Sequence, residues 1–188
     1  AQIDRIAEHN TQKVLAAFQA HRVAEHMFAG TTGYGYDDRG RDTLEQIYAD
    51  IFHTEDAVVR IQFVNGTHAI TCALFGNLRP GDVLCYVTGE PYDTIQSVIG
   101  IVGNEPGNMK QYGIEYRQVD MLKSGLPDED AVAQAVRDPK VKIAMIQRSR
   151  GYSTRESLSV AQIGSLCRRI HEANPDCAIM VDNCYGEF

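Results

Sequence analysis

The spacing of apolar residues along this chain changes near residue 56. Before that point, apolar residues recur every three or four positions through residues 2–28, which predicts one or two helices. A glycine-rich turn follows at 30–40, and the capping-box pattern of Asp42 and Glu45 predicts a short helix that begins there and runs to Phe52. We therefore expect residues 1–55 to form a helical arm with a loop rich in tyrosine, aspartate, arginine and glycine.

From residue 57 onward, short apolar runs alternate with segments of helical periodicity. This order is typical of β-α-β units, and near-continuous apolar strands joined by helices predict a mainly parallel sheet covered on both faces. We expect residues 56–188 to form this α/β domain. The predicted strands are 57–61, 83–87, 116–119, 143–146 and 178–181, and the predicted helices are 67–78, 92–100, 128–137 and 159–173.

The composition is that of a globular protein and narrows the classes of partner. The 188 residues include 18 Lys and Arg against 25 Asp and Glu, for a net charge of −7. This acidic balance argues against nucleic acid as a binding partner. The first residues are charged, and no apolar run has the length of a membrane span, so we expect a cytoplasmic protein. The five cysteines lie in or beside apolar runs without metal or redox spacing, which indicates reduced core thiols.

Polar and aromatic residues follow four of the five predicted strands. The carboxyl ends of parallel strands meet at one edge of a sheet, and ligands bind there. The turns concerned are 65–68, 89–92, 147–151 and 182–185. We expect all four to converge on one site.

The first of these turns has the features of an anion cradle. Gly66 and Thr67 open a helix, so their N–H groups and the helix dipole suit a phosphate or a carboxylate. The alternative is a plain helix cap, which the sequence favours equally. His68 lies in the same turn, whereas the other histidines are scattered without metal-ligand spacing. We therefore expect no metal site.

The other turns add an aromatic ring, an acid and two cations. Tyr92 follows Pro91 at a helix start, where its ring is placed to cover a planar ligand or to fill the rim of the core. Asp182 ends an apolar strand, so its carboxylate needs a polar partner unless it only forms a turn, which Asn183 can form unaided. Arg148 and Arg150 suit an anionic substrate, with surface ion pairs as the alternative.

A phosphate cradle, a stacking ring and an acid at a strand end are what pyridoxal phosphate requires. On these residues the chain resembles the fold-type-I pyridoxal-phosphate enzymes. It is more closely similar to the methionine gamma-lyase-like group often labelled aluminium resistance proteins. The motifs that carry this resemblance span nearly the whole chain: GYGYDDRGRDTLE (33–45), VRIQFVNGTHAI (59–70), LRPGD (78–82), GEPYDT (89–94), QRSRGYSTRESL (147–158) and VDNCYGEF (181–188).

The resemblance implies a cofactor site that is shared between the subunits of a homodimer or homotetramer. Asn65 stands where the family usually has serine, which removes one hydroxyl contact to the phosphate. The positions that match cofactor-binding residues are Gly66, Thr67 and His68 in the phosphate turn, Tyr92 on the ring, Asp182 at the pyridinium nitrogen, and Tyr36 and Arg41 in a loop that reaches the neighbouring subunit's phosphate.

The activity implied by the resemblance is a carbon–sulfur lyase that acts on sulfur amino acids through an external aldimine. Arg148 and Arg150 then hold the substrate carboxylate. In this family the Schiff-base lysine follows the strand that ends at Asp182, and the chain ends at Phe188 before such a lysine, so we expect a portion of a larger enzyme that is inactive alone. β- and γ-elimination share every residue present. The rival interpretation is a non-catalytic α/β module that binds a phosphorylated small molecule.

Overall fold

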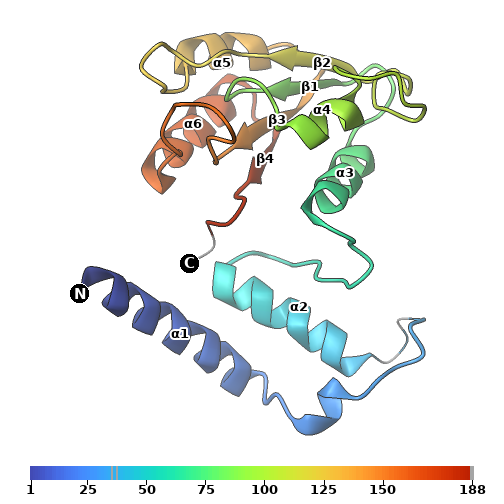
Figure 1. The fold of residues 1–188 in the computed structure, drawn as a ribbon, viewed down its shortest axis with the longest axis vertical. Helices are drawn as coiled ribbons and strands as arrows, with labels where there is room; N and C mark the ends of the chain where they lie inside the picture. Colours follow the sequence, from blue (N-terminus) through green and yellow to red (C-terminus); the bar gives the residue numbers. More distant parts are fainter. Residues whose placement is uncertain (35, 37, 187–188) are drawn as a thin grey trace. The chain divides into compact units, whose positions relative to one another are not determined.

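The computed structural model describes residues 1–34, 36 and 38–186, and their contacts divide them into two units, one ending at Phe63 and the other beginning at Val64. The first unit is helical and contains α1 (Gln2–Ala20), the 3₁₀ helix η1 (Glu25–Phe28) and α2 (Arg39–Phe52) (Figure 1). Its small core is made of Ala17, Ile47 and Ile51, against which Val14, Phe18 and Val23 pack. The helices expected in this part of the chain are confirmed.

The start of α2 lies earlier than expected. Asp38 caps the helix, since its Oδ1 accepts a hydrogen bond from the Arg41 amide at 3.2 Å, whereas Asp42 lies inside the first turn. Either aspartate can cap an N-terminus, and the one that reaches a free amide does so. Gly40 in the same turn lies against η1: a Cβ there would be only 2.1 Å from the Met27 carbonyl oxygen. Only glycine permits this close approach.

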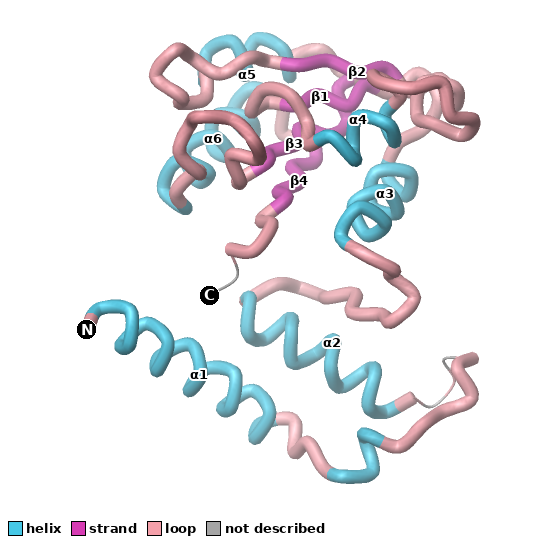
Figure 2. The backbone as a smooth tube through the Cα atoms, viewed as in Figure 1, coloured by secondary structure: helices cyan, strands magenta, loops and turns pink. Residues whose placement is uncertain are grey.

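The second unit is a four-stranded parallel sheet flanked by helices (Figure 2). The strands lie in the spatial order β2 (Glu115–Gln118), β1 (Val83–Tyr86), β3 (Val141–Gln147) and β4 (Ala178–Asp182), and every pairing is parallel. The helices are α3 (Gly66–Asn77), α4 (Asp93–Ile99), α5 (Glu129–Val136) and α6 (Val160–Ala173). The predicted α/β class is confirmed.

Successive side chains of the central strands enter two separate cores. Val83 and Cys85 of β1 pack with residues of α5 and α6, whereas Leu84 and Tyr86 pack with residues of α3 and α4. Because these strands are buried on both faces, their sequences are continuous apolar runs rather than alternating ones. The helices therefore cover both faces of the sheet, as expected.

The strand predicted at 57–61 is wrong. Residues 57–60 have no regular secondary structure, and Val58 and Ile61 are 68% and 90% exposed. The amide of Val59 donates to the Glu45 carboxylate at 2.8 Å instead of to a neighbouring strand, and Arg60 forms an ion pair with the same carboxylate. An apolar run becomes a strand only where another strand pairs with it.

The cysteine prediction is only partly correct. All five cysteines are free thiols, and Cys85 and Cys177 are buried, but Cys72 and Cys184 are exposed. Burial raises the pKa of the Cys85 thiol to about 11. This thiol is therefore protonated and inert near neutral pH.

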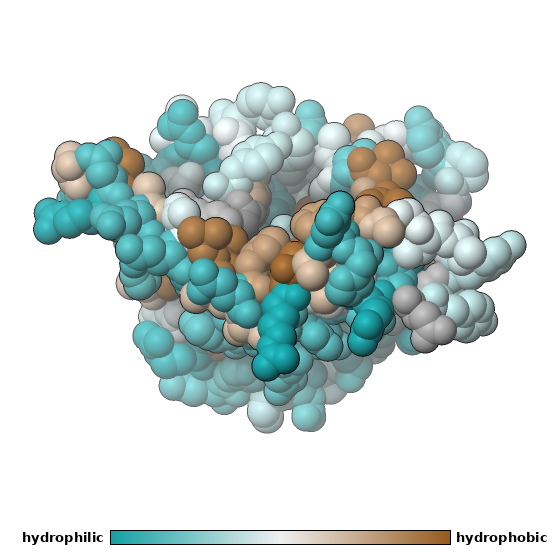
Figure 3. All heavy atoms as spheres, turned by 90° about the horizontal axis from the view of Figure 1, so that it is seen from below, coloured by the Kyte–Doolittle hydropathy of each residue, from teal (hydrophilic) through white to brown (hydrophobic). Residues whose placement is uncertain are grey.

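Small apolar patches interrupt a largely hydrophilic surface on the face drawn in Figure 3. On α1, Ile3, Ile6 and Leu15 are exposed and line a shallow groove of about 450 Å³. In the part of the chain that the structure describes, no helix has both the length and the apolar character needed to cross a membrane.

Candidate functional site

Residues from all four predicted turns line one cavity of about 830 Å³ in the second unit, although the turn at 65–68 follows an irregular segment rather than a strand. The cavity lies where β3 and β4 end and where α3 and α4 begin. Parallel strands direct their carboxyl ends to one edge, and this brings together segments that are far apart in the sequence. The predicted convergence of the turns is confirmed, and the cavity is lined by Gly66, Thr67, Tyr92, Arg150 and Asp182 among others.

The first turn of α3 offers hydrogen-bond donors to this cavity. Asn65 caps the helix, with its Oδ1 accepting from the His68 amide at 2.8 Å. Within the described residues, the amides of Gly66 and Thr67 have no acceptor, and a Cβ built on Gly66 would meet no atom within 4 Å. The Thr67 hydroxyl is 2.9 Å from that of Thr94. The turn is thus a capped helix start that leaves two donors and open space for an anion.

His68 has a different environment from the two residues before it. Its Nδ1 accepts a hydrogen bond from the Val64 amide at 3.2 Å, and its side chain is exposed. It is not among the residues that line the cavity. Adjacent helical residues point about 100° apart, so Gly66 and Thr67 can face a ligand while His68 faces the preceding loop.

Tyr92 lies at the start of α4 and is held by its backbone and by its ring. Its amide donates to Gln147 Oε1 at 2.9 Å. Its ring stacks on Tyr152 with centroids 5.7 Å apart and planes 22° apart, and the two hydroxyl oxygens are 3.2 Å apart. This hydroxyl contact raises the pKa of Tyr92 to about 12. With 36% of its surface exposed, Tyr92 is a rim residue with a fixed orientation.

Asp182 ends β4 and is half-buried at the cavity. Its Oδ1 accepts from the Cys184 amide at 3.0 Å, so Asp182 itself forms the turn, which was the alternative interpretation of this residue. Burial raises the pKa of the nearby Tyr86, and the charge of Asp182 raises it further. The carboxylate is therefore both a turn residue and a negative charge beside the cavity.

The two arginines predicted to hold an anion differ in their contacts. The Arg148 guanidinium donates to the Leu158 and Gly186 carbonyls and to Asn183 Oδ1, at 3.2, 3.0 and 3.1 Å, and it does not line the cavity. Arg150 lines the cavity and is exposed. Arg148 therefore braces the turn after β4, and only Arg150 is placed to meet a ligand.

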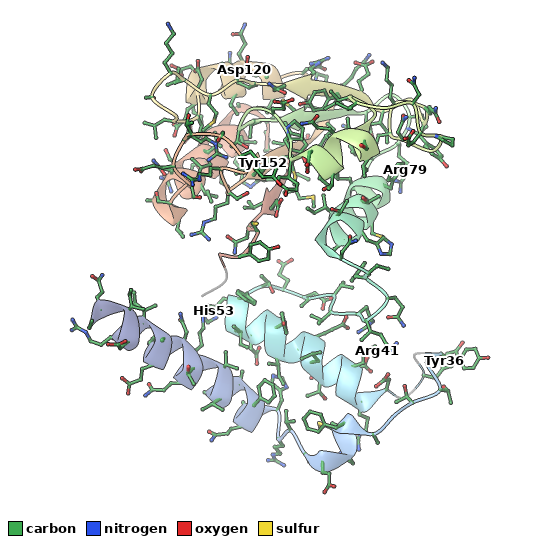
Figure 4. All side chains as sticks on the ribbon, in the orientation of Figure 1. Tyr36, Arg41, His53, Arg79, Asp120 and Tyr152 are labelled. Atoms are coloured by element: carbon green, nitrogen blue, oxygen red, sulfur yellow. The ribbon has the colours of Figure 1, made fainter. Side chains whose placement is uncertain are left out.

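The other two predicted cofactor residues belong to the first unit. Arg41 lies on α2, with its Nε 3.2 Å from the Asp38 carboxylate. Tyr36 is 84% exposed and extends from its loop (Figure 4). Gly35 and Asp37, which flank Tyr36, lie outside the described residues.

Two contributors to the site were not among the predicted site residues, although Gln147 opens the predicted turn at 147–151. Gln147 and Tyr152 hold Tyr92, and both come from β3 or the loop after it. Gln147 is a buried amide at the end of an apolar strand, which is a signal in the sequence, whereas no local pattern indicates Tyr152. Over residues 1–34, 36 and 38–186, no three side chains group as metal ligands, and no described lysine lines the cavity.

The donors at α3, the ring of Tyr92 and the carboxylate of Asp182 fit the phosphate, the ring face and the protonated nitrogen of pyridoxal phosphate. Comparison with known families agrees: the family described as methionine gamma-lyase matches residues 1–188. The chain belongs to this family. Its membership rests on the full length of the chain, not on the cavity alone.

Several relatives share this fold. A "putative cystathionine beta-lyase involved in aluminum resistance" from Listeria innocua has a TM-score of 0.95 and 48% identity, over 99% of this chain and 45% of its own. A carbon-sulfur lyase from Clostridium novyi NT has a TM-score of 0.92 and 46% identity, over 98% of this chain and 44% of its own. The pyridoxal-5'-phosphate dependent protein YhfS from Escherichia coli, at 21% identity and a TM-score of 0.69, shows a similar fold.

A curated relative is also about twice as long as the part that this chain matches. The Bacillus subtilis (strain 168) protein YnbB is 50% identical over all 188 residues of this chain, which cover 44% of its own length. The chain thus spans about half the length of the relatives that it matches.

Proposed function

We propose that these residues contribute the cofactor cavity of a cytoplasmic pyridoxal-phosphate-dependent carbon–sulfur lyase that acts on sulfur amino acids. The observation that carries the proposal is the single cavity that brings together free amides, an aromatic ring and a carboxylate from three separate turns. The methionine gamma-lyase family and the printed names of the Listeria and Clostridium structures support it.

Each part of the cofactor has a matching group in the cavity. The amides of Gly66 and Thr67 and the Thr67 hydroxyl bind the phosphate, which the dipole of α3 favours. Tyr92 covers the ring, and the charge of Asp182 keeps the ring nitrogen protonated. When bound, the cofactor supplies an electron sink for the Cα carbanion of an amino acid.

The remaining groups orient the substrate. Arg150, exposed at the cavity, takes the substrate carboxylate, and Arg148 holds the turn that carries Asp182 in place through Asn183 and Gly186. Tyr36 and Arg41 contribute to the site of a second subunit in a homodimer or homotetramer. The lysine that binds the cofactor comes from a part of the parent protein beyond these residues.

The test uses the full-length protein. Incubation with pyridoxal phosphate followed by borohydride reduction should attach the cofactor covalently to a lysine, which peptide mass spectrometry would locate after the equivalent of Phe188. In a separate sample that has not been reduced, cystathionine or methionine should yield a thiol and ammonia, with pyruvate indicating β-elimination and 2-oxobutanoate indicating γ-elimination. Binding without covalent capture would favour the non-catalytic module instead.

A further inference from the structure

We propose that Tyr152 is a positioning residue of this site, which fixes the ring and the hydroxyl of Tyr92. The expected effect on cofactor binding rests on the proposed function, whereas the position of Tyr92 follows from its direct contacts with Tyr152. The rings stack with centroids 5.7 Å apart and planes 22° apart, and the hydroxyl oxygens are 3.2 Å apart. A tyrosine pair held at both the ring and the hydroxyl has one relative orientation.

The residue before Tyr152 also lies against the Tyr92 ring. A Cβ built on Gly151 would be 3.5 Å from Tyr92 Cδ2, and Gly151 has φ of +54°. This left-handed conformation suits glycine and turns the chain so that Tyr152 follows directly over its partner. The Gly151–Tyr152 step therefore acts as one side of a clamp on Tyr92.

The loop that carries this step is anchored to the end of β3. The Arg155 guanidinium donates to the carbonyl oxygens of Gln147 and Ser149, and burial lowers the pKa of Arg155. Gln147 Nε2 donates to the same Ser149 oxygen at 3.3 Å, while Gln147 Oε1 accepts from the Tyr92 amide. Contacts at the end of β3 thus hold both the Tyr92 backbone and the loop that carries Tyr152, although the Tyr152 side chain is 85% exposed.

The tyrosine pair also lines two cavities. Tyr92 and Tyr152 line the cofactor cavity and, equally, a neighbouring cavity of about 790 Å³ that includes Asp120 and Lys123. Since Tyr152 covers one face of Tyr92, a planar ligand that stacks on Tyr92 takes the other face. Tyr152 therefore supports the Tyr92 ring on the face opposite to such a ligand.

The first experiment needs no cofactor. In full-length protein labelled with [ζ-¹³C]tyrosine, the resonance absent from Tyr92→Phe identifies Tyr92, and its pH titration gives the pKa. Tyr152→Phe should move this pKa from about 12 toward the ordinary 10.0. Tyr112→Phe, which keeps its ring against Phe75, should leave it unchanged. An unchanged Tyr92 titration in Tyr152→Phe would overturn the hydroxyl contact.

The second experiment measures binding of pyridoxal phosphate to the same full-length variants. Tyr152→Phe keeps the stacked ring and should bind within about twofold of the wild type, whereas Tyr152→Ala should bind about 3- to 10-fold more weakly. Tighter binding by Tyr152→Ala would overturn the proposal, because Tyr152 would then occupy the face that the ligand needs. If the wild type binds no cofactor, the proposed function fails, while the titration still decides whether Tyr152 positions Tyr92.

Discussion

Replacing Asp182 by asparagine separates the two roles of this side chain. Its Oδ1 accepts the Cys184 amide at 3.0 Å, and a carboxamide oxygen can accept the same bond. Asp182→Asn therefore removes the charge and retains the turn, and the free energy of unfolding of the cofactor-free protein should change by less than about 0.5 kcal/mol. Asp182→Ala also loses the turn bond and should be less stable by about 0.5–1.5 kcal/mol.

The affinity for pyridoxal phosphate should respond to the charge. A hydrogen bond between a carboxylate and a charged N–H contributes about 1.5–3 kcal/mol. At about 1.4 kcal/mol per factor of ten, Asp182→Asn should weaken cofactor binding by about 10- to 150-fold. Turnover should fall as well, because a ring with a neutral nitrogen is a weaker electron sink.

The assay is a titration of the cofactor-free full-length protein with pyridoxal phosphate, together with urea unfolding of each variant. Asp120→Asn is the matched control, since Asp120 follows β2 and lines the neighbouring cavity rather than the proposed cofactor cavity. Equal affinities for Asp182→Asn and the wild type would refute the assignment of Asp182. Equal losses in both asparagine variants would show that only the general charge of this edge matters.

Further substitutions test three other parts of the structure. Gly66→Ala meets no atom within 4 Å and should leave the unfolding free energy nearly unchanged, yet weaken cofactor binding about tenfold by obstructing the phosphate; Gly76→Ala in the same helix should instead stabilise by about 0.5–1 kcal/mol without affecting binding. Gly40→Ala places its Cβ 2.1 Å from the Met27 carbonyl oxygen and should destabilise the first unit by about 1–3 kcal/mol in urea unfolding, whereas an unchanged midpoint would contradict the close approach. Between pH 9.0 and about 11 the unfolded Cys85 thiol loses its proton while the native thiol keeps it, so stability should fall with rising pH by up to about 3 kcal/mol, and Cys85→Ala should flatten this fall.

The parallel sheet was predictable because its central strands, β1 and β3, are buried on both faces and are therefore continuous apolar runs, at 83–87 and 143–146. The apolar run at 178–181 also corresponds to a strand, β4, although β4 is partly exposed. The apolar run at 57–61 has the same local character but no partner strand, and its amide at Val59 bonds to a carboxylate instead. Local composition cannot distinguish these cases, because pairing is a property of two segments.

The position of the candidate site at one edge of the sheet was predictable from the sequence, but the directions of its side chains were not. Once the strands are parallel, the turns after β1 and β4, which contain Tyr92 and Asp182, must meet at one edge, whereas Gly66 joins them through the start of α3 and not through a strand end. The direction of a side chain is a different matter. His68 turns toward Val64, and Arg148 is occupied by the turn after β4, although both lie in turns that reach this edge.

The sequence by itself determined the class of sheet, the edge at which the chemistry gathers and, apart from the strand expected at 57–61, the order of elements, because burial and helix periodicity are local patterns. The tertiary structure alone decided which side chains face the cavity. Gln147 is paired with Asp182 by the register of β3 and β4, and the loop after β3 brings Tyr152 onto Tyr92, 60 residues earlier in the chain. Contacts of this kind depend on how distant segments align, so they cannot be predicted from the spacing of residues along the chain.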